Sequence, residues 1–264
     1  MLTETIMPES QEYLAEEEAL LQCILDMGEL LLTSGAEVMR VEDTISRLCA
    51  VYGFARWDVF TITSSIVLTV RTPGGRTVTQ TRRILSRDTD LGRVEKVNAL
   101  SRRLCQCPAG LAEFRQAVDE IRAAGVYPVW IQRLMYMMIS GAFSVFFGGT
   151  VADGLASCLS GLVLFETLRW ITPLRLNGTI QCMAASFLTG FAAALLCQIG
   201  LGQNPDKIII GNIMLLIPGI AFTSALWDII NGDTLSGLLG LCEAVLRALA
   251  VAIGFAAMLL WTGG

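Results

Sequence analysis

The residues best suited to chemistry lie in one short stretch, IPGIAFTSALWDIINGD, which runs from Ile217 to Asp233. Pro218 and Gly219 interrupt an apolar run that is otherwise able to cross a bilayer. Proline removes a backbone hydrogen bond, and a broken membrane helix can bind anionic substrate groups or coupling ions through its freed backbone groups. We therefore expect a substrate carboxylate at this break, with Thr223 and Ser224 in the same pathway. A packing kink is the alternative interpretation, because proline is commoner in membrane helices than in soluble ones.

Four charged residues follow the break. Asp228 stands at the end of the apolar run, where a carboxylate is either interfacial or part of a proton or ion relay. Asp233 is placed to cap the next helix. Glu243 and Arg247 are four residues apart, so a helix can pair them. We include all four in the candidate substrate and ion pathway, and leave open whether Glu243 and Arg247 form a structural pair or line that pathway.

A second group of polar residues lies near the N-terminus and consists of Ser34, Gly35, Glu37 and Arg40. Ser34 and Glu37 have the spacing of a capping box, which predicts that a helix begins here. Arg40 belongs to a charged helix face that could bind a ligand or a partner, although such faces are usually solvated.

The usual catalytic motifs are missing from the sequence. It has no His, no Walker loop, no G-x-S-x-G and no H-E-x-x-H. Cys105 and Cys107 form a pair, but no second pair accompanies them, and the eight cysteines have no repeated spacing. We therefore expect no catalytic residue, no metal site and no cofactor.

The N-terminal half must position the second polar group, and its patterns predict a small α+β domain over residues 1–132. Apolar residues at helical spacing predict helices over 20–32, 36–52, 93–104 and 110–124. Between these helices, apolar residues occupy even-numbered positions, and this alternation predicts a strand with one covered face. The residues are Phe60, Ile62, Ile66, Leu68 and Val70. A turn at 73–75 would lead to a hairpin partner at 77–82.

The break at Pro218 belongs to a membrane domain over residues 133–264. The chain is 53% hydrophobic, and residues 1–132 hold 14 of its 19 Lys and Arg and 18 of its 24 Asp and Glu. A hydrocarbon core of ~30 Å needs about 20 apolar residues per helix. The apolar segments predict five transmembrane helices, at about 134–152, 154–171, 179–201, 208–227 and 235–261.

Charge near these segments predicts their orientation. Arg133, Arg169 and Arg175 flank one side of the predicted spans and Lys207 the other, so the positive-inside rule leaves the N-terminal domain in the cytoplasm. The first twenty residues lack the basic and apolar regions of a signal peptide. The net charge of −5 and the absence of a basic patch argue against nucleic acid as a partner. We expect a multi-pass protein of the inner cell membrane, with the lipid bilayer as a partner.

Two segments resemble a known family. LLIPGIAFTSALWDIINGDTLSG is similar to the signature of threonine/serine exporter proteins, and GELLLTSGAEVMRVEDTISRLCAVYG resembles the opening of their N-terminal cytosolic domain. The resemblance implies an inner-membrane exporter. It also places a set of residues in the family's characteristic segments: Gly28, Ser34, Gly35, Ala36, Glu37, Pro218, Gly219, Thr223, Asp228, Gly232 and Asp233.

The resemblance further implies a two-component assembly. Full-length members carry a second, shorter membrane region, which this chain lacks before its end at Gly264. It therefore resembles the larger subunit of the split form, whose partner is a separate small membrane protein and some of whose members are associated with succinate export. We expect a secondary exporter subunit for a small carboxylate metabolite, with partner binding, self-association or both. A membrane-anchored sensor or assembly subunit is the alternative, and a membrane-bound enzyme is disfavoured by the missing motifs.

Overall fold

The computed structural model describes residues 8–125, 127–174 and 176–262. The chain divides into two compact units. The first unit comprises Met1–Gly125 and Ile220–Leu241, and the second comprises Val126–Gly219 and Cys242–Gly264. Arg175 and the first seven residues, which entered the predictions on orientation and on a signal peptide, lie outside the described residues.

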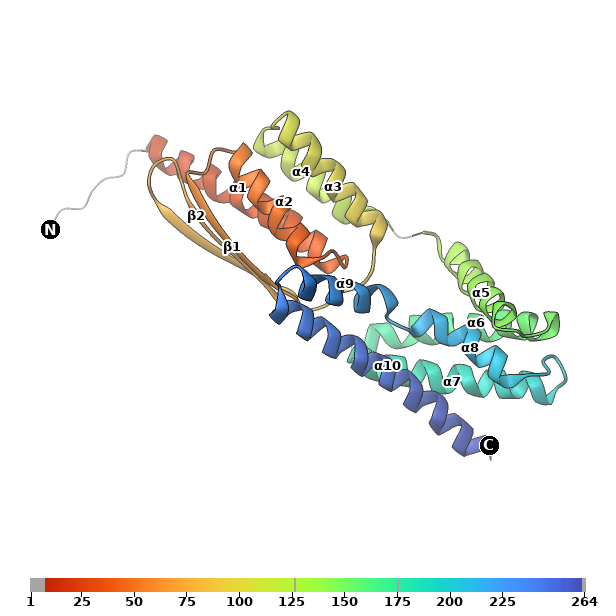
Figure 1. The fold of residues 1–264 in the computed structure, drawn as a ribbon. Coiled ribbons are helices and arrows are strands. Elements are labelled where there is room, and N and C mark those ends of the chain that lie inside the picture. The colour runs from red at the N-terminus through yellow and green to blue at the C-terminus, as the bar shows by residue number, and fades with distance from the viewer. Residues whose placement is uncertain (1–7, 126, 175, 263–264) are drawn as a thin grey trace. The chain divides into compact units, whose positions relative to one another are not determined.

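A three-stranded sheet covered by helices forms the centre of the first unit. The strands β1 (Arg56–Ile62), β2 (Ser65–Arg71) and β3 (Thr77–Arg83) pair antiparallel in that order. The helices α1 (Pro8–Thr33) and α2 (Val38–Val51) cover one face of this sheet (Figure 1). The expected combination of helices with a small sheet is confirmed.

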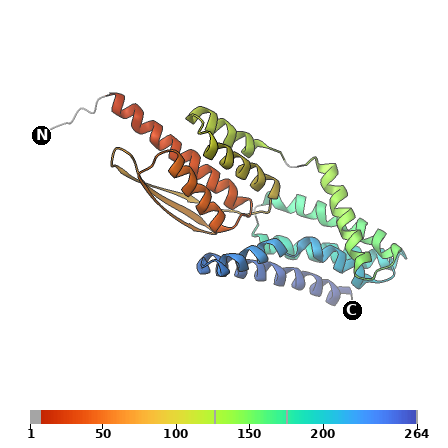
Figure 2. The ribbon, with the colours of Figure 1, turned by 45° about the horizontal axis from the view of Figure 1, so that its top comes forward.

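Further helices pack on the far side of α1 and α2. They are α3 (Leu91–Gln106) and α4 (Leu111–Ala123), and Figure 2 shows this layer above the two helices that cover the sheet. Most of α9 (Gly219–Ile230) and the start of α10 (Thr234–Thr262) complete the unit. Segments nearly 200 residues apart in sequence therefore share one fold.

The predicted single strand between positions 60 and 70 is wrong, because a turn at Thr63-Ser64 divides it into β1 and β2. The hairpin pairs Ile62 with Ser65 and Thr61 with Ile66. Opposed residues share a face of the sheet, so the odd-numbered residues of β1 and the even-numbered residues of β2 face the helices. Thr61 is accordingly buried, whereas Phe60 is 57% exposed.

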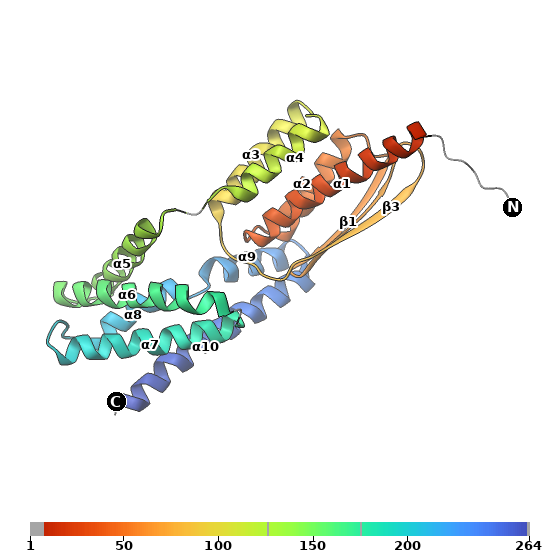
Figure 3. The same ribbon diagram turned by 180° about the vertical axis from the view of Figure 1, so that it is seen from behind.

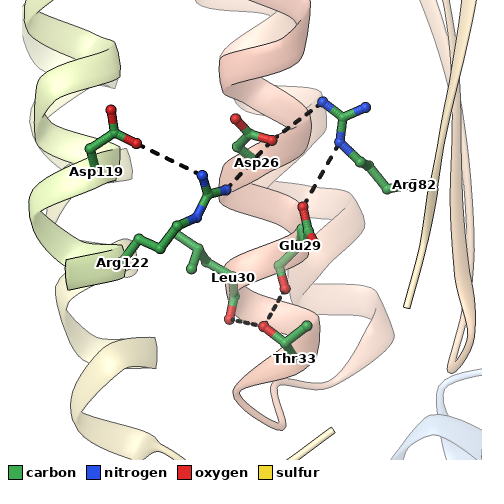
Figure 4. A network of polar contacts seen from close by, with 7 residues as sticks. All are labelled: Asp26, Glu29, Leu30, Thr33, Arg82, Asp119 and Arg122. Atoms are coloured by element: carbon green, nitrogen blue, oxygen red, sulfur yellow. Dashed lines mark hydrogen bonds and ion pairs between the residues drawn. The ribbon is translucent and has the colours of Figure 1, made fainter. Parts of the chain in front are cut away.

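A polar network fastens the sheet and α4 to α1 (Figure 4). Arg82 of β3 pairs with Asp26 at 3.3 Å and with Glu29 at 3.8 Å. Arg122 of α4 approaches the same Asp26 oxygen at 3.6 Å and pairs with Asp119 at 3.8 Å. Because its groups are partly buried and shared, this network holds three elements in register better than isolated surface pairs would.

The second unit is a helical bundle. It contains α5 (Val129–Phe146), α6 (Val151–Ile171), α7 (Gly178–Gln198) and α8 (Pro205–Leu216), with a short 3-10 turn at Thr172–Leu174. The helix α6 contacts α5, α7 and α8, and Figure 3 shows α6 and α7 side by side. The remainder of α10 belongs to the same unit.

The predicted membrane spans correspond to long apolar helices. Within the described residues, four helices are long and apolar enough to cross a membrane: α5, α6 (with the 3-10 turn), α7 and α10. The bent pair α8–α9 makes a fifth if it counts as one span. The prediction of several helices able to span a membrane is confirmed, and the count of five spans stays a prediction.

The end of the first predicted span differs from the structure. Its helix, α5, ends at Phe146 rather than near position 152. Gly148 follows with a φ of +90°, a conformation that a residue with a side chain rarely adopts, so the helix stops here. Arg133 near the start of α5 pairs with Glu166 near the end of α6, which ties these neighbouring helices at one end.

Candidate functional site

The helix breaks where the sequence predicted. The helix α8 ends at Leu216 and α9 begins at Gly219, with Ile217 extended between them at φ −66° and ψ 125°. The residue before a proline is driven away from the helical region, and Pro218 has no N–H to donate. The Gly219 N–H donates to the Ile217 carbonyl at 2.8 Å. The apolar segment is therefore two helices rather than one continuous helix.

Of the two hydroxyl-bearing residues of α9, Ser224 lies one turn before Asp228 on the same side of the helix, whereas Thr223 does not. Thr223 is exposed, and its Oγ1 donates to the Ile220 carbonyl at 2.9 Å. Ser224 is half-buried. The buried residues of α9 are Ala225 and Asp228.

Asp228 is the central residue of the candidate site. Its side chain is only 3% exposed, and its Oδ1 accepts a hydrogen bond from the Val38 N–H at 3.2 Å. Val38 is the first residue of α2, where backbone N–H groups lack partners within the helix and where the helix dipole favours negative charge. Asp228 therefore caps α2 from 190 residues away in the sequence.

The predicted capping box at Ser34 and Glu37 is wrong. The structure makes Glu37 the N-cap of α2, with no capping hydrogen bond from its side chain. Ser34 is buried, and its Oγ has no hydrogen-bond partner among the residues that the structure describes. The Asp228 carboxylate instead accepts from the first N–H group of α2, because the fold brings α9 to this end of α2.

The loop between α1 and α2 is held by a segment that sequence reasoning missed. Arg87 donates from Nε to the Leu32 carbonyl at 3.2 Å and from Nη2 to the Ala36 carbonyl at 3.3 Å. Gly35 has a φ of +87°, and a Cβ there would lie 3.1 Å from the Asp88 carbonyl oxygen. The loop therefore needs glycine both for its backbone conformation and for the close approach of this segment.

Charges of both signs surround Asp228. Those that act on it include the positive charge of Arg87 and the negative charges of Asp233 and Glu37. Arg40 pairs with Glu37 at 3.6 Å and is 48% exposed, so it lies on a solvated face. Of the predicted N-terminal group, the structure thus brings Glu37 close to Asp228 and leaves Arg40 at the surface.

The turn between α9 and α10 contacts the end of β1. The Asp233 N–H donates to the Asp228 carbonyl at 2.9 Å, and the Asp233 carbonyl accepts from Gly237 at the start of α10. Ser236 donates from Oγ to the Thr61 carbonyl at 3.3 Å. The predicted position of Asp233, immediately before the last helix, agrees with the structure.

Glu42 is a further carboxylate of this region and belongs to the same predicted charged helix as Glu37 and Arg40. Its Oε1 accepts from the Thr61 N–H at 2.7 Å. Burial raises the pKa of the Glu42 carboxyl above its ordinary 4.5; the hydrogen bond from Thr61 opposes this rise, and the charge of Asp233 adds to it. The packing of β1 against α2 brings Glu42 and Thr61 together, so no local pattern could have identified the contact.

Glu243 and Arg247 are not joined in the structure. Both lie on the part of α10 that belongs to the second unit, and no ion pair connects them within the described chain. Glu243 is exposed, whereas Arg247 is half-buried, with its guanidinium within 4 Å of a Cβ built at Gly178. The interpretation as a structural ion pair is therefore not what the structure shows.

A buried polar cluster in the second unit was also missed. Asn212 of α8 donates from Nδ2 to the Ser160 Oγ at 2.7 Å and accepts at Oδ1 from the Ser140 Oγ at 2.9 Å. Ser140 and Ser157 bond to each other at 2.7 Å between α5 and α6. The abundance of small residues was the available signal, and it predicts close packing without identifying which hydroxyls pair.

Asp153 is a buried carboxylate of the second unit. Its two oxygens accept hydrogen bonds from Thr150, Gln203 and Asn204, at 2.7 to 2.9 Å. These donors satisfy the charge without a cation. Asp153 thus fastens the start of α6 to the loop before α8, a structural role.

Comparisons with known proteins place the chain in a family. The family model for threonine/serine exporters (ThrE) matches residues 22–261. The chain is 25% identical over 240 residues to the "Probable threonine/serine exporter" of Mycobacterium tuberculosis, which is 89% of this chain but 44% of that relative, so the chain spans less than half of its length.

Two further relatives match over nearly their whole length. Each is named "Probable succinate transporter subunit YjjP", one from Klebsiella aerogenes and one from Escherichia coli. Each is 23% identical to this chain, over 94% and 93% of it respectively and over 96% of the relative. No solved structure matches. The chain belongs to the threonine/serine exporter family.

Proposed function

We propose that this chain is a subunit of a secondary exporter that moves a small carboxylate metabolite out of the cytoplasm, and that it is not an enzyme. Family membership supports transport. The observation that carries the proposal is a broken apolar segment whose second helix, α9, bears a buried carboxylate, Asp228. Threonine, serine and a dicarboxylate such as succinate are the candidate substrates, following the names of the relatives.

The substrate carboxylate is proposed to bind at the first turn of α9. Helix N-termini present unpaired N–H groups and the positive end of the dipole, which suits an anion. Pro218 and Gly219 stop α8 and expose this turn in the middle of an apolar segment. Thr223, Ser224, Asp233, Glu243 and Arg247 remain proposed residues of the pathway.

Asp228 is proposed as the proton or coupling-ion site. A carboxylate at a helix N-terminus is stabilised by about 0.3–2 kcal/mol relative to its neutral form. Protonation of Asp228 would therefore weaken its hold on the Val38 N–H and loosen α9 from α2. This links a proton gradient to movement of the helix that carries the break.

The proposed setting is the inner cell membrane, with the N-terminal part in the cytoplasm. Arg133 and Arg169 lie at one end of the α5–α6 pair, and Lys207 lies at the start of α8, which supports the orientation by the positive-inside rule. A second, smaller membrane subunit is proposed because two relatives of matching length are named subunits.

A sensor or assembly subunit is the second candidate function. The separate apolar core of the first unit favours it, because that core would support a ligand-binding domain without any transport path. Partner-dependent efflux would decide for the exporter.

The test is efflux from proteoliposomes with and without the small partner subunit, preloaded with labelled threonine, serine or succinate under a proton gradient. We expect Asp228→Asn and Pro218→Ala to lower efflux by about tenfold or more, a change of ~1.4 kcal/mol in the barrier. Asp206→Asn is the matched control, since Asp206 is exposed at the start of α8. Wild-type rates in correctly inserted Asp228→Asn and Pro218→Ala proteins would refute the mechanism.

A further inference from the structure

A pocket of about 320 Å³ in the first unit is separate from the candidate site. It lies between the N-terminal half of α1, the end of α2, the turn before β3 and the start of α4. Its lining consists of Glu16, Glu17, Leu20, Tyr52, Phe54, Pro73, Ala109, Gly110 and Leu111. A volume near 300 Å³ is at the lower end of the range for small-molecule sites.

The apolar wall of the pocket is rigid. Tyr52 stacks on Phe114 with ring centroids 5.6 Å apart, and its hydroxyl donates to the Ala109 carbonyl at 3.1 Å. Phe54 is only 6% exposed. Because the tyrosine hydroxyl is already engaged, the aromatic groups offer a ligand apolar surface and ring faces rather than further hydrogen bonds.

The polar end of the pocket is acidic. Among the described residues that line it, the charged ones are Glu16 and Glu17, and Arg76 lies next to Glu17. The Glu17 side chain is 11% exposed, and its Oε1 is buried without a hydrogen-bond partner among the residues that the structure describes. Its other oxygen, Oε2, lies 3.7 Å from Arg76, which pairs more closely with Glu18 at 3.1 Å. Two carboxylates at one end of an apolar pocket suit a cationic group, which would form charge-assisted hydrogen bonds there.

We propose that this pocket binds an organic ammonium compound with a short apolar body. The ammonium group would donate to the Glu17 carboxylate, and the apolar body would lie against Leu20, Tyr52 and Phe54. A cation near aromatic rings gains further attraction from their faces. An anionic ligand is disfavoured, because the charged side chains that line the pocket within the described residues are both acidic.

The test is calorimetric titration of the full chain in lipid nanodiscs, with empty nanodiscs as the reference. The probes are isopentylamine, its neutral isostere isopentanol and the anionic isovalerate. We expect the amine to bind and the other two not to bind. Glu17→Gln should weaken amine binding about tenfold or more, whereas Glu95→Gln, the matched control at an exposed position of α3 outside the pocket, should leave it unchanged.

A second variant tests occupancy of the pocket itself. Gly110 has an ordinary φ of −64°, and a Cβ added there meets no heavy atom within 4 Å, so Gly110→Leu should fold while filling the pocket. We expect it to abolish amine binding. The proposal is overturned if the wild type does not bind the amine, if isopentanol or isovalerate binds equally well, or if either Glu17→Gln or Gly110→Leu binds like the wild type. None of these outcomes depends on transport.

Discussion

Asp228 and Glu42 are two carboxylates that accept a hydrogen bond from the backbone of another element. Asp228 accepts from Val38 at the start of α2, and Glu42 accepts from Thr61 on β1. Both are near Asp233, whose charge acts on each of them. The junction of α2, β1 and the α9–α10 turn therefore concentrates negative charge in a partly buried place, which makes its packing sensitive to protonation.

Glu42 predicts a pH dependence of stability. Its pKa is raised in the folded chain, so the folded state binds a proton more tightly than the unfolded state. This contribution to stability is fully present below the ordinary pKa of 4.5 and is lost as the pH rises through the folded value. We expect the melting temperature of the wild type, relative to Glu42→Gln, to fall by a few degrees between mildly acidic and neutral pH.

The measurement for Glu42 is thermal unfolding of the full chain in detergent at a series of pH values. Glu95→Gln is the matched control, because Glu95 is exposed on α3. The melting temperature of Glu95→Gln should differ from that of the wild type by the same amount at every pH in the series. The raised pKa of Glu42 would be contradicted if the difference in melting temperature between the wild type and Glu42→Gln stayed constant with pH. It would also be contradicted if the wild type became more stable relative to Glu42→Gln as the pH rises.

At the scale of elements, α8 is held in the bundle by polar contacts as well as by apolar packing. Asn212 bridges Ser140 of α5 and Ser160 of α6, and it also donates to the Ile208 carbonyl within α8 at 2.8 Å. In a membrane environment, helix association depends on close packing and on such interhelical hydrogen bonds. Hydrogen bonds to α5 and α6 therefore hold α8, the helix that ends at the Pro218 break, in the bundle.

Replacement of Asn212 by Ala should weaken this support. The Ser140 and Ser160 hydroxyls would each lose a bond, and we expect a loss of about 1–2 kcal/mol in the stability of the bundle. Unfolding in mixed detergent micelles would measure it. Asn231→Ala is the matched control, because exposed Asn231, directly after α9, donates from Nδ2 to the Trp227 carbonyl of that helix at 2.9 Å. Equal losses in the two variants would show that the cluster does not support α8.

The whole molecule is a multi-pass membrane protein of an exporter family. Its orientation remains a prediction from charge. Cys107 is an exposed residue of the first unit, and Leu201 is exposed in the loop between α7 and α8. The positive-inside rule expects these two positions on opposite sides of the membrane.

Cysteine labelling in intact cells tests this orientation. In a chain whose other cysteines are alanine, Cys107 should react with a membrane-impermeant maleimide only after the cells are permeabilised. Leu201→Cys in a chain without Cys107 should react in intact cells. The reverse pattern would invert the proposed topology and with it the direction of export.

Several features could be determined from the sequence alone because their causes are local. Pro218 lacks an N–H and restricts Ile217, so the break between α8 and α9 follows from two adjacent residues. The apolar segments follow from hydropathy along the chain. The motifs around Ser34 and Asp228 were also sufficient to indicate the family, which the match over residues 22–261 shows.

The partners of the charged and polar residues were decided only by the tertiary structure. Asp228 caps α2 because the fold brings residues 190 positions apart together, and no local pattern encodes that contact. The alternation of residues along β1 defines two faces of the strand, but it does not say which face the helices cover. The two-residue turn at Thr63-Ser64 decides this, because it sets the register in which β1 pairs with β2. Asn212 likewise finds its partners on two other helices. Local sequence thus sets where helices begin and break, whereas long-range packing selects which groups meet.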